Sequence, residues 1–197
     1  IAGDVRALRF ASSRMQQMDE TALYAVALHE DAFDHCIEEA RQNCKDFVIR
    51  AIRARRSTYR SLVSGGNPLV HDRDVVVEAL QDPNGYTVSL VPSALLHDRG
   101  IALDAVRKRG MCLQWNRFYL AHASDFEVLH AAVTQAGKAL RHIKRPNNLS
   151  AEEYRKLALA AVAQDGYAYT YVTIYDDREI ALTAVTQAGG ALEFVLE

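Results

Sequence analysis

The stretch Asp177–Val195, DREIALTAVTQAGGALEFV, repeats a pattern that occurs earlier in the chain. Val128–Ile143 reads VLHAAVTQAGKALRHI, so the tetrapeptide TQAG occurs in both stretches. In each copy an Ala-Val pair precedes the TQAG glycine and an Ala-Leu pair follows it. A sequence that recurs in this way within one chain indicates a structural unit that recurs.

An alanine followed by an aliphatic residue recurs along nearly the whole chain. The aliphatic members of these pairs, which we call the anchors, are Val26, Ile52, Leu80, Val106, Val133, Val162 and Val185, at steps of 23 to 29 residues. Periods of about 20 to 50 residues are typical of tandem arrays of supersecondary units. The alanine beside each anchor predicts a buried contact at which two helices approach closely.

Each repeat has the pattern of a helical hairpin. Apolar residues four and five positions before most anchors share one helical face. SDFE at Ser124–Glu127, SAEE at Ser150–Glu153 and DDRE at Asp176–Glu179 predict capping boxes. Gly110, Gly137, Gly166 and Gly189 each lie four residues after an anchor, where we expect a left-handed helix C-cap. The short apolar segment after each glycine predicts a second helix of about two turns.

These features predict an all-α fold, a solenoid-like array of about seven short helical hairpin repeats. We expect one helical-repeat domain over residues 1–197, as part of a longer or processed chain. Tyr167–Tyr175 alternates aromatic and small residues, which alone favours a strand, but the repeat register places a helix there. We favour the register, and we expect a turn at Asp82–Gly85.

The pattern Asp-x-Glu-x-x-Leu-x-Ala-Val-x-x-x-Gly-x-Ala-Leu resembles a family of short tandem helical repeats, the domain of unknown function 4116. Asp177–Val195 and Asp125–Ile143 match this pattern best, and Asp98–Asn116 is a third copy. The resemblance implies an all-helical array, often within a longer protein. It implies no catalytic residues.

Composition and charge limit the classes of function. A net charge of −2 gives no general attraction to nucleic acid or to an anionic membrane. No apolar run is long enough to predict a transmembrane segment. Cys36, Cys44 and Cys112 lack metal-ligand spacing, so we expect free thiols in an intracellular, reducing compartment, cytoplasmic or organellar.

We predict no catalytic residue, metal site or cofactor. His29, Asp31, His35 and Cys36 lie close together, but their spacing fits turn residues better than metal ligands. Val63–Pro68 is glycine-rich, but it lacks the Lys-Ser/Thr pair of a phosphate-binding loop, which makes a linker the better interpretation.

Two groups of residues depart most from the repeat and are our candidates for partner binding. Arg53, Arg56 and Arg60 belong to an arginine ridge, Arg50–Arg60, and would share one face of a continuous helix. Trp115, Phe118 and Tyr119 have helical spacing and include residue types common in binding hot spots. A solvated helix face for the arginines and a core position for the aromatic residues are the alternative interpretations.

The sequence therefore predicts a non-enzymatic scaffold or accessory subunit that binds protein partners in a larger assembly. One alternative is binding of RNA or another polyanion through the arginine ridge. Another is a repeat segment of a larger enzyme or effector.

Overall fold

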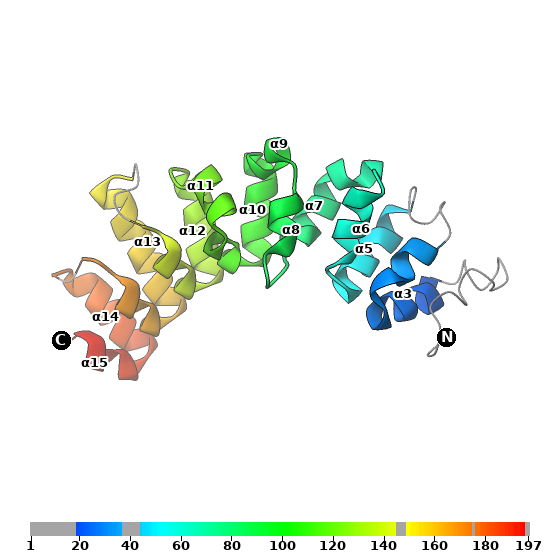
Figure 1. Cartoon of the computed structure of the whole chain (residues 1–197). Coiled ribbons are helices and arrows are strands. Elements are labelled where there is room, and N and C mark those ends of the chain that lie inside the picture. The colour runs from blue at the N-terminus through cyan, green and yellow to red at the C-terminus, as the bar shows by residue number, and fades with distance from the viewer. Residues whose placement is uncertain (1–18, 37–43, 145–148, 175, 196–197) are drawn as a thin grey trace. The chain divides into compact units, whose positions relative to one another are not determined.

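The computed structural model describes residues 19–36, 44–144, 149–174 and 176–195. All regular elements among these residues are helices, which confirms the predicted all-α class. The helices form two compact parts, Ile1–Leu95 and Leu96–Glu197, and each part is described on its own (Figure 1). The prediction of one domain over the whole chain stays a prediction.

The N-terminal part consists of short α-helices joined by 3₁₀ turns. Its described elements are α3 (Asp19–Leu28), η1 (Glu30–His35), α5 (Lys45–Ala54), α6 (Thr58–Ser64), η2 (Pro68–His71), α7 (Arg73–Ala79) and α8 (Tyr86–Leu90). α9 (Ser93–Leu96) crosses the boundary between the parts. The predicted turn at Asp82–Gly85 is confirmed, since Gly85 has a φ of 72° and Asp82 accepts a hydrogen bond from the N–H of Asn84.

The C-terminal part alternates longer α-helices with 3₁₀ helices. Its elements are α10 (Arg99–Lys108), η3 (Gly110–Gln114), α11 (Asn116–His122), α12 (Phe126–Gln135), η4 (Gly137–His142), α13 (Ala151–Gln164), η5 (Gly166–Tyr171), α14 (Arg178–Gln187), η6 (Gly189–Ala191) and α15 (Leu192–Val195). Figure 1 shows α10, α12, α13 and α14 following one another in chain order through this part.

The helices that carry the anchors contact their neighbours in chain order. In the N-terminal part α3 contacts α5 and α5 contacts α7; in the C-terminal part α10, α12, α13 and α14 form the same succession. The alanines beside the anchors are fully buried, as predicted: Ala25, Ala51, Ala79, Ala105, Ala132, Ala161 and Ala184. Because an alanine side chain is short, the neighbouring helices can lie close together at these positions.

The segments after the long helices of the C-terminal part are 3₁₀ helices of about two turns, the length that the sequence predicts for the second helix. η3, η4 and η5 each have five or six residues, and a 3₁₀ helix has three residues per turn. Their central apolar residues, Leu113, Leu140 and Tyr169, are buried. η5 occupies most of Tyr167–Tyr175, the stretch with strand-like composition. Residues 166–174 contain no strand, and Tyr175 lies outside the described residues.

The prediction of left-handed glycine caps is wrong for all four repeat glycines. Among the described residues only Gly66 and Gly85 have positive φ. The residue before each repeat glycine ends the helix in an extended conformation, for example Ala136 at φ −146° and ψ 103°. The glycine is needed for a different reason: a Cβ on Gly137 would lie 2.4 Å from the carbonyl oxygen of Ala161 in the next long helix.

The glutamine of the repeat bonds to the glycine of the preceding repeat. The main-chain N–H of Gly137 donates a hydrogen bond to Oε1 of Gln164 at 2.6 Å. The same bond joins Gly110 to Gln135 and Gly166 to Gln187. The first N–H of each of these 3₁₀ helices has no acceptor within its own helix, and the glutamine of the neighbouring long helix supplies one.

The helix N-termini differ in part from the predicted capping boxes. The complete box occurs at Ser150 and Glu153, as predicted. At α12 and α14 the caps are instead Asp125 and Asp177, whose carboxylates accept main-chain N–H bonds. The acidic residue two positions after each of these caps, Glu127 or Glu179, binds an arginine of the preceding long helix.

These arginines form a clamp between neighbouring helices. Arg155 donates to Asp177 at 2.6 Å, and this bond holds the pKa of the Asp177 carboxyl below its usual range. Arg155 also binds Glu179. Two other pairs of helices have the same clamp. In each pair the basic residue lies seven positions before one anchor, and the two acidic residues lie eight and six positions before the next anchor. The residues are Arg99 with Asp125 and Glu127, and Lys45 with Asp72 and Asp74.

Candidate functional site

The arginine ridge is partly used inside the fold. Arg53 Nε and Arg56 Nη1 both lie 3.1 Å from the carboxylate oxygens of Glu78 on α7. The side chain of Glu78 is only 7% exposed, while that of Arg53 is 57% exposed. Burial alone would raise the pKa of Glu78, but the hydrogen bonds from Arg56 and Arg53 outweigh it and lower the pKa below its usual value. Arg56 therefore has a structural role that the sequence did not indicate.

Arg55, which we did not single out from the sequence, has a similar role. Its Nε donates to the carbonyl oxygen of Val26 at 2.9 Å and its Nη2 donates to that of Ala27 at 3.0 Å. These carbonyls belong to the last turn of α3, where a cation also interacts favourably with the helix dipole. The guanidinium of Arg55 thus joins α3 to the end of α5.

Arg60 differs from the other arginines of the ridge. It lies on α6, its side chain is exposed, and among the described residues it forms no ion pair. It borders a groove of about 460 Å³. The groove is lined by Arg55, Arg56, Ser57, Arg60, Asp82, Asn84, Tyr86, Thr87 and Leu90.

The wall opposite the arginines is an ordered turn followed by α8. Tyr86, the first residue of α8, is 66% exposed, and Leu90 is partly exposed one turn later. The buried carboxylate of Asp82 accepts a hydrogen bond from the N–H of Thr87, and the hydroxyl of Thr87 donates to the carbonyl of Ala79. These bonds position Tyr86, so an exposed cation and an amphipathic aromatic ring line the same groove.

Ser57 supplies an unused polar group beside the groove. Its Oγ is buried and has no hydrogen-bond partner in the structure, although buried polar atoms are nearly always satisfied. Ser57 and Arg60 also border a neighbouring cavity of about 370 Å³, together with Asp31 and Asp34.

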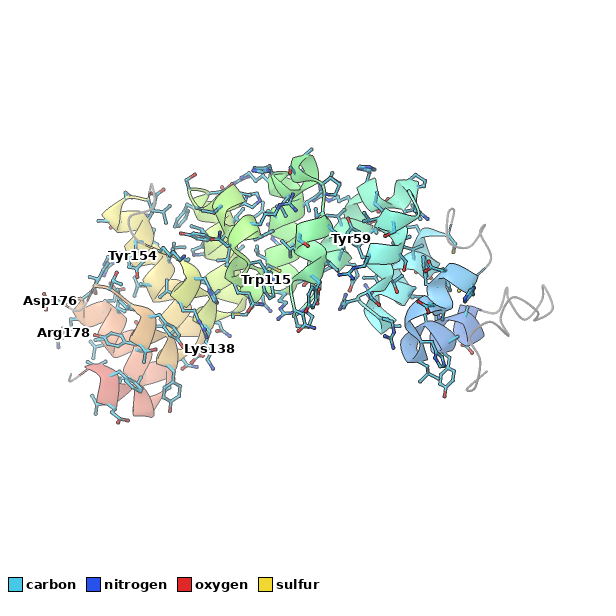
Figure 2. All side chains as sticks on the ribbon, in the orientation of Figure 1. Tyr59, Trp115, Lys138, Tyr154, Asp176 and Arg178 are labelled. Atoms are coloured by element: carbon cyan, nitrogen blue, oxygen red, sulfur yellow. The ribbon has the colours of Figure 1, made fainter. Side chains whose placement is uncertain are left out.

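The predicted aromatic site has a different character. Phe118 is fully buried and Tyr119 is 5% exposed, so the expectation of an exposed aromatic surface is wrong for both. The ring of Phe118 lies 5.3 Å from that of His122, and the hydroxyl of Tyr119 accepts a hydrogen bond from the N–H of Lys144. They hold α11 in the core. Only Trp115 is partly exposed, and Figure 2 labels it in the C-terminal part.

A wide, shallow hollow lies between α13 and α14. Its lining includes Ala163, Leu182 and Thr186, and Leu182 is 55% exposed. Its exposed lining is more strongly apolar than that of the groove beside Arg60. The groove therefore offers more specific polar recognition.

In the described part of the chain no group of three or more His, Cys, Asp or Glu side chains has an arrangement that could hold a metal ion. His29, Asp31, His35 and Cys36 form no such group. The described helices are also too short or too polar for any of them to cross a membrane.

Comparisons with models of known families, with curated proteins and with solved structures gave no match. The resemblance to the domain of unknown function 4116 family stays a prediction from the repeated motif.

Proposed function

We propose that this chain is a non-enzymatic protein-interaction module, a solenoid-like array of helical repeats that acts as a scaffold or accessory subunit. The groove between α6 and α8 is the proposed binding site. Its partner is a protein segment with a carboxylate that pairs with Arg60 and an apolar side chain that lies against Tyr86 and Leu90.

One observation carries this proposal: Arg60 borders a groove and has no ion pair with any described residue, whereas the neighbouring arginines are occupied. Arg55 binds carbonyls of α3 and Arg56 binds Glu78, so both are held in place by the fold. An exposed arginine and an exposed tyrosine facing one groove are residue types that most often contribute binding energy at protein interfaces.

Two further features fit this proposal. Helical repeats use residues outside their recurring positions for recognition, and Arg60 and Tyr86 are not among the recurring residues.

We also propose a reducing compartment, since Cys36, Cys44 and Cys112 form no disulfide.

The test is affinity capture from a native extract with the immobilised full chain, followed by mass spectrometry of the bound proteins. We expect Arg60→Glu and Tyr86→Ala each to lose a specific partner. The matched control is Arg141→Glu, which reverses an exposed arginine of η4, far in sequence from the groove. It should retain that partner, and Arg60→Glu should melt like the parent because Arg60 forms no ion pair within the described part of the chain.

A partner bound equally by the parent, both groove variants and the control would contradict the site. Captured material that disappears after nuclease treatment, and whose binding falls steeply with added salt, would instead favour the polyanion alternative.

A further inference from the structure

The contacts between successive long helices are directional. One helix contributes what we call the outgoing face: a basic residue seven positions before the anchor, the anchor itself, and a glycine N–H four positions after it. The next helix contributes the incoming face: an N-cap aspartate, an acidic residue two positions later, and a glutamine ten positions after the aspartate. α13 and α14 meet with all of these groups, through Arg155 with Asp177 and Glu179, and Gly166 with Gln187.

The pair α10 and α12 has the same arrangement. Arg99 binds Asp125 and Glu127, and the N–H of Gly110 donates to Gln135 at 2.6 Å. A Cβ on Gly110 would lie 2.1 Å from the carbonyl oxygen of Ala132, so the helices touch through the glycine. Two independent pairs of helices thus define the chemistry of both faces.

α14 has all the residues of an outgoing face, and none of them is used within the described part of the chain. Arg178 holds the clamp position, is exposed and has no ion pair there, and Figure 2 shows it at the edge of the C-terminal part. The N–H of Gly189 has no acceptor among the described residues. A Cβ on Gly189 would meet nothing within 4 Å, in contrast to Gly110, Gly137 and Gly166.

The apolar residues of this face are also uncovered. Val185 is partly exposed, although the corresponding anchors Val106, Val133 and Val162 are fully buried. Leu192 is 46% exposed, whereas Leu140, seven positions after its own anchor like Leu192, is 1% exposed. The face therefore combines an unpaired cation, an unpaired donor and exposed apolar side chains in the pattern that another helix covers elsewhere.

We propose that the outgoing face of α14, formed by Arg178, Val185, Gly189 and Leu192, is a docking surface for a helical repeat that carries an incoming face. The docked helix begins with Asp-x-Glu or Asp-x-Asp and carries glutamine ten residues after the aspartate. Its carboxylates bind Arg178, its glutamine accepts the Gly189 N–H, and a small residue three positions before that glutamine contacts Gly189. Charge complementarity and the two formed pairs argue for this occupant.

A second copy of this chain is a poorer occupant. The incoming faces of α7, α12 and α14 are already engaged through Asp72, Asp125 and Asp177. α10 has Asp98 at its N-cap but a glycine two positions later and Lys108 in place of the glutamine. No described helix presents an unused incoming face with all three groups.

The experiment supplies an incoming face whose chemistry is known. A second copy of residues 172–197 is fused directly after Glu197 of the full chain, so that its copies of Asp177, Glu179 and Gln187 follow α14 in register. We expect the amide exchange of Gly189 to slow by about tenfold or more and the melting temperature of the C-terminal part to rise. In the matched control the fused copy carries Asp177→Ala and Gln187→Ala, and neither change should occur.

A free peptide with the sequence Asp176–Val195 provides the second measurement. Titrated into the full chain, it should shift the amide resonances of Gly189 and Leu192, and the Asp177→Ala, Gln187→Ala peptide should not. If the fused parent and control copies protect Gly189 equally, or if neither protects it, this docking surface is excluded. Self-association of the unfused chain that is lost on Arg178→Glu would also overturn the proposal. The site depends on the contacts of α14 and not on the groove beside Arg60, so the two proposals fail separately.

Discussion

Oε1 of Gln164 on α13 accepts a hydrogen bond from the main-chain N–H of Gly137, the first residue of η4, at 2.6 Å. The carbonyl oxygen of Ala161, one turn before Gln164, lies against the same glycine. α13 thus supplies the acceptor for the Gly137 N–H and also occupies the space that a side chain at position 137 would need. This combined contact explains why glutamine and glycine recur together in TQAG.

Gln164→Ala should destabilise the C-terminal part. Gly137 is buried, so the loss of its acceptor should cost about 1–3 kcal/mol in the free energy of unfolding. Chemical denaturation measures this change, and amide exchange locates it. Exchange at Gly137 should become faster, while Gly110, which bonds to Gln135, serves as an internal control. Equal acceleration at both glycines would show a general loosening instead of a lost bond.

Gly137→Ala and Gly189→Ala form a matched pair within the same motif. A Cβ at Gly137 would overlap the main-chain carbonyl of Ala161, so we expect a loss of about 1–3 kcal/mol in the free energy of unfolding. At Gly189 a Cβ meets nothing and φ is not positive, so the change should be neutral or stabilising by less than about 1 kcal/mol. Thermal denaturation of the two variants distinguishes close approach from a general need for glycine.

The sequence predicted the helices well because their determinants are local. Apolar spacing and the predicted capping boxes located long helices to within about a residue at their starts, and the burial of Ala132 and Ala161 followed from the register of the repeat. The strand-like stretch after Gly166 is helical as far as Tyr171, as the register predicted, since the buried Tyr169 aligns with Leu140 in the preceding repeat. Periodicity carried more information there than residue propensity.

The contacts between helices were harder to predict because they depend on partners about 25 residues away. Gln164 looks like an ordinary helical surface residue until its acceptor role toward Gly137 is seen. The burial of Glu78 and its pairing with Arg56 required a contact between α5 and α7. One signal of these contacts is present in the sequence. A basic residue recurs seven positions before an anchor, and acidic residues recur eight and six positions before the next anchor.

Ala161→Leu should overpack the contact between α13 and its neighbours. Ala161 is fully buried, and the added side chain should cost about 1–3 kcal/mol in the free energy of unfolding. Ala163→Leu is the control, because Ala163 is exposed on the same helix and borders the shallow hollow. Its stability should stay within about 0.5 kcal/mol of the parent. Equal melting of both variants would mean that the alanine register of this repeat is wrong.

Acidification should weaken the contact between α5 and α7 through Glu78. Its folded-state pKa is lowered, because the hydrogen bonds from Arg56 and Arg53 outweigh burial. The unfolded chain therefore binds the proton more readily than the folded chain. The stability that this carboxylate contributes is present above its unfolded pKa of about 4.3 and is lost as the pH falls through the lower folded value.

Glu78→Gln isolates this contribution from those of the other carboxylates. At pH 7 the variant should be less stable than the parent, because Arg53 and Arg56 lose their charged acceptor. Below about pH 4.3 the difference should begin to shrink, because the unfolded parent then takes up a proton at Glu78. It should be small once the pH lies below the lower folded-state pKa, where the folded parent carries a neutral Glu78 as well. Denaturant unfolding at pH 7, 5, 4 and 3 measures both curves. Glu152→Gln, which changes an exposed carboxylate on α13, is the matched control. A difference between Glu78→Gln and the parent that stays constant at every pH would mean that Glu78 has the same proton affinity in the folded and unfolded chain, which would contradict its pairing with Arg53 and Arg56.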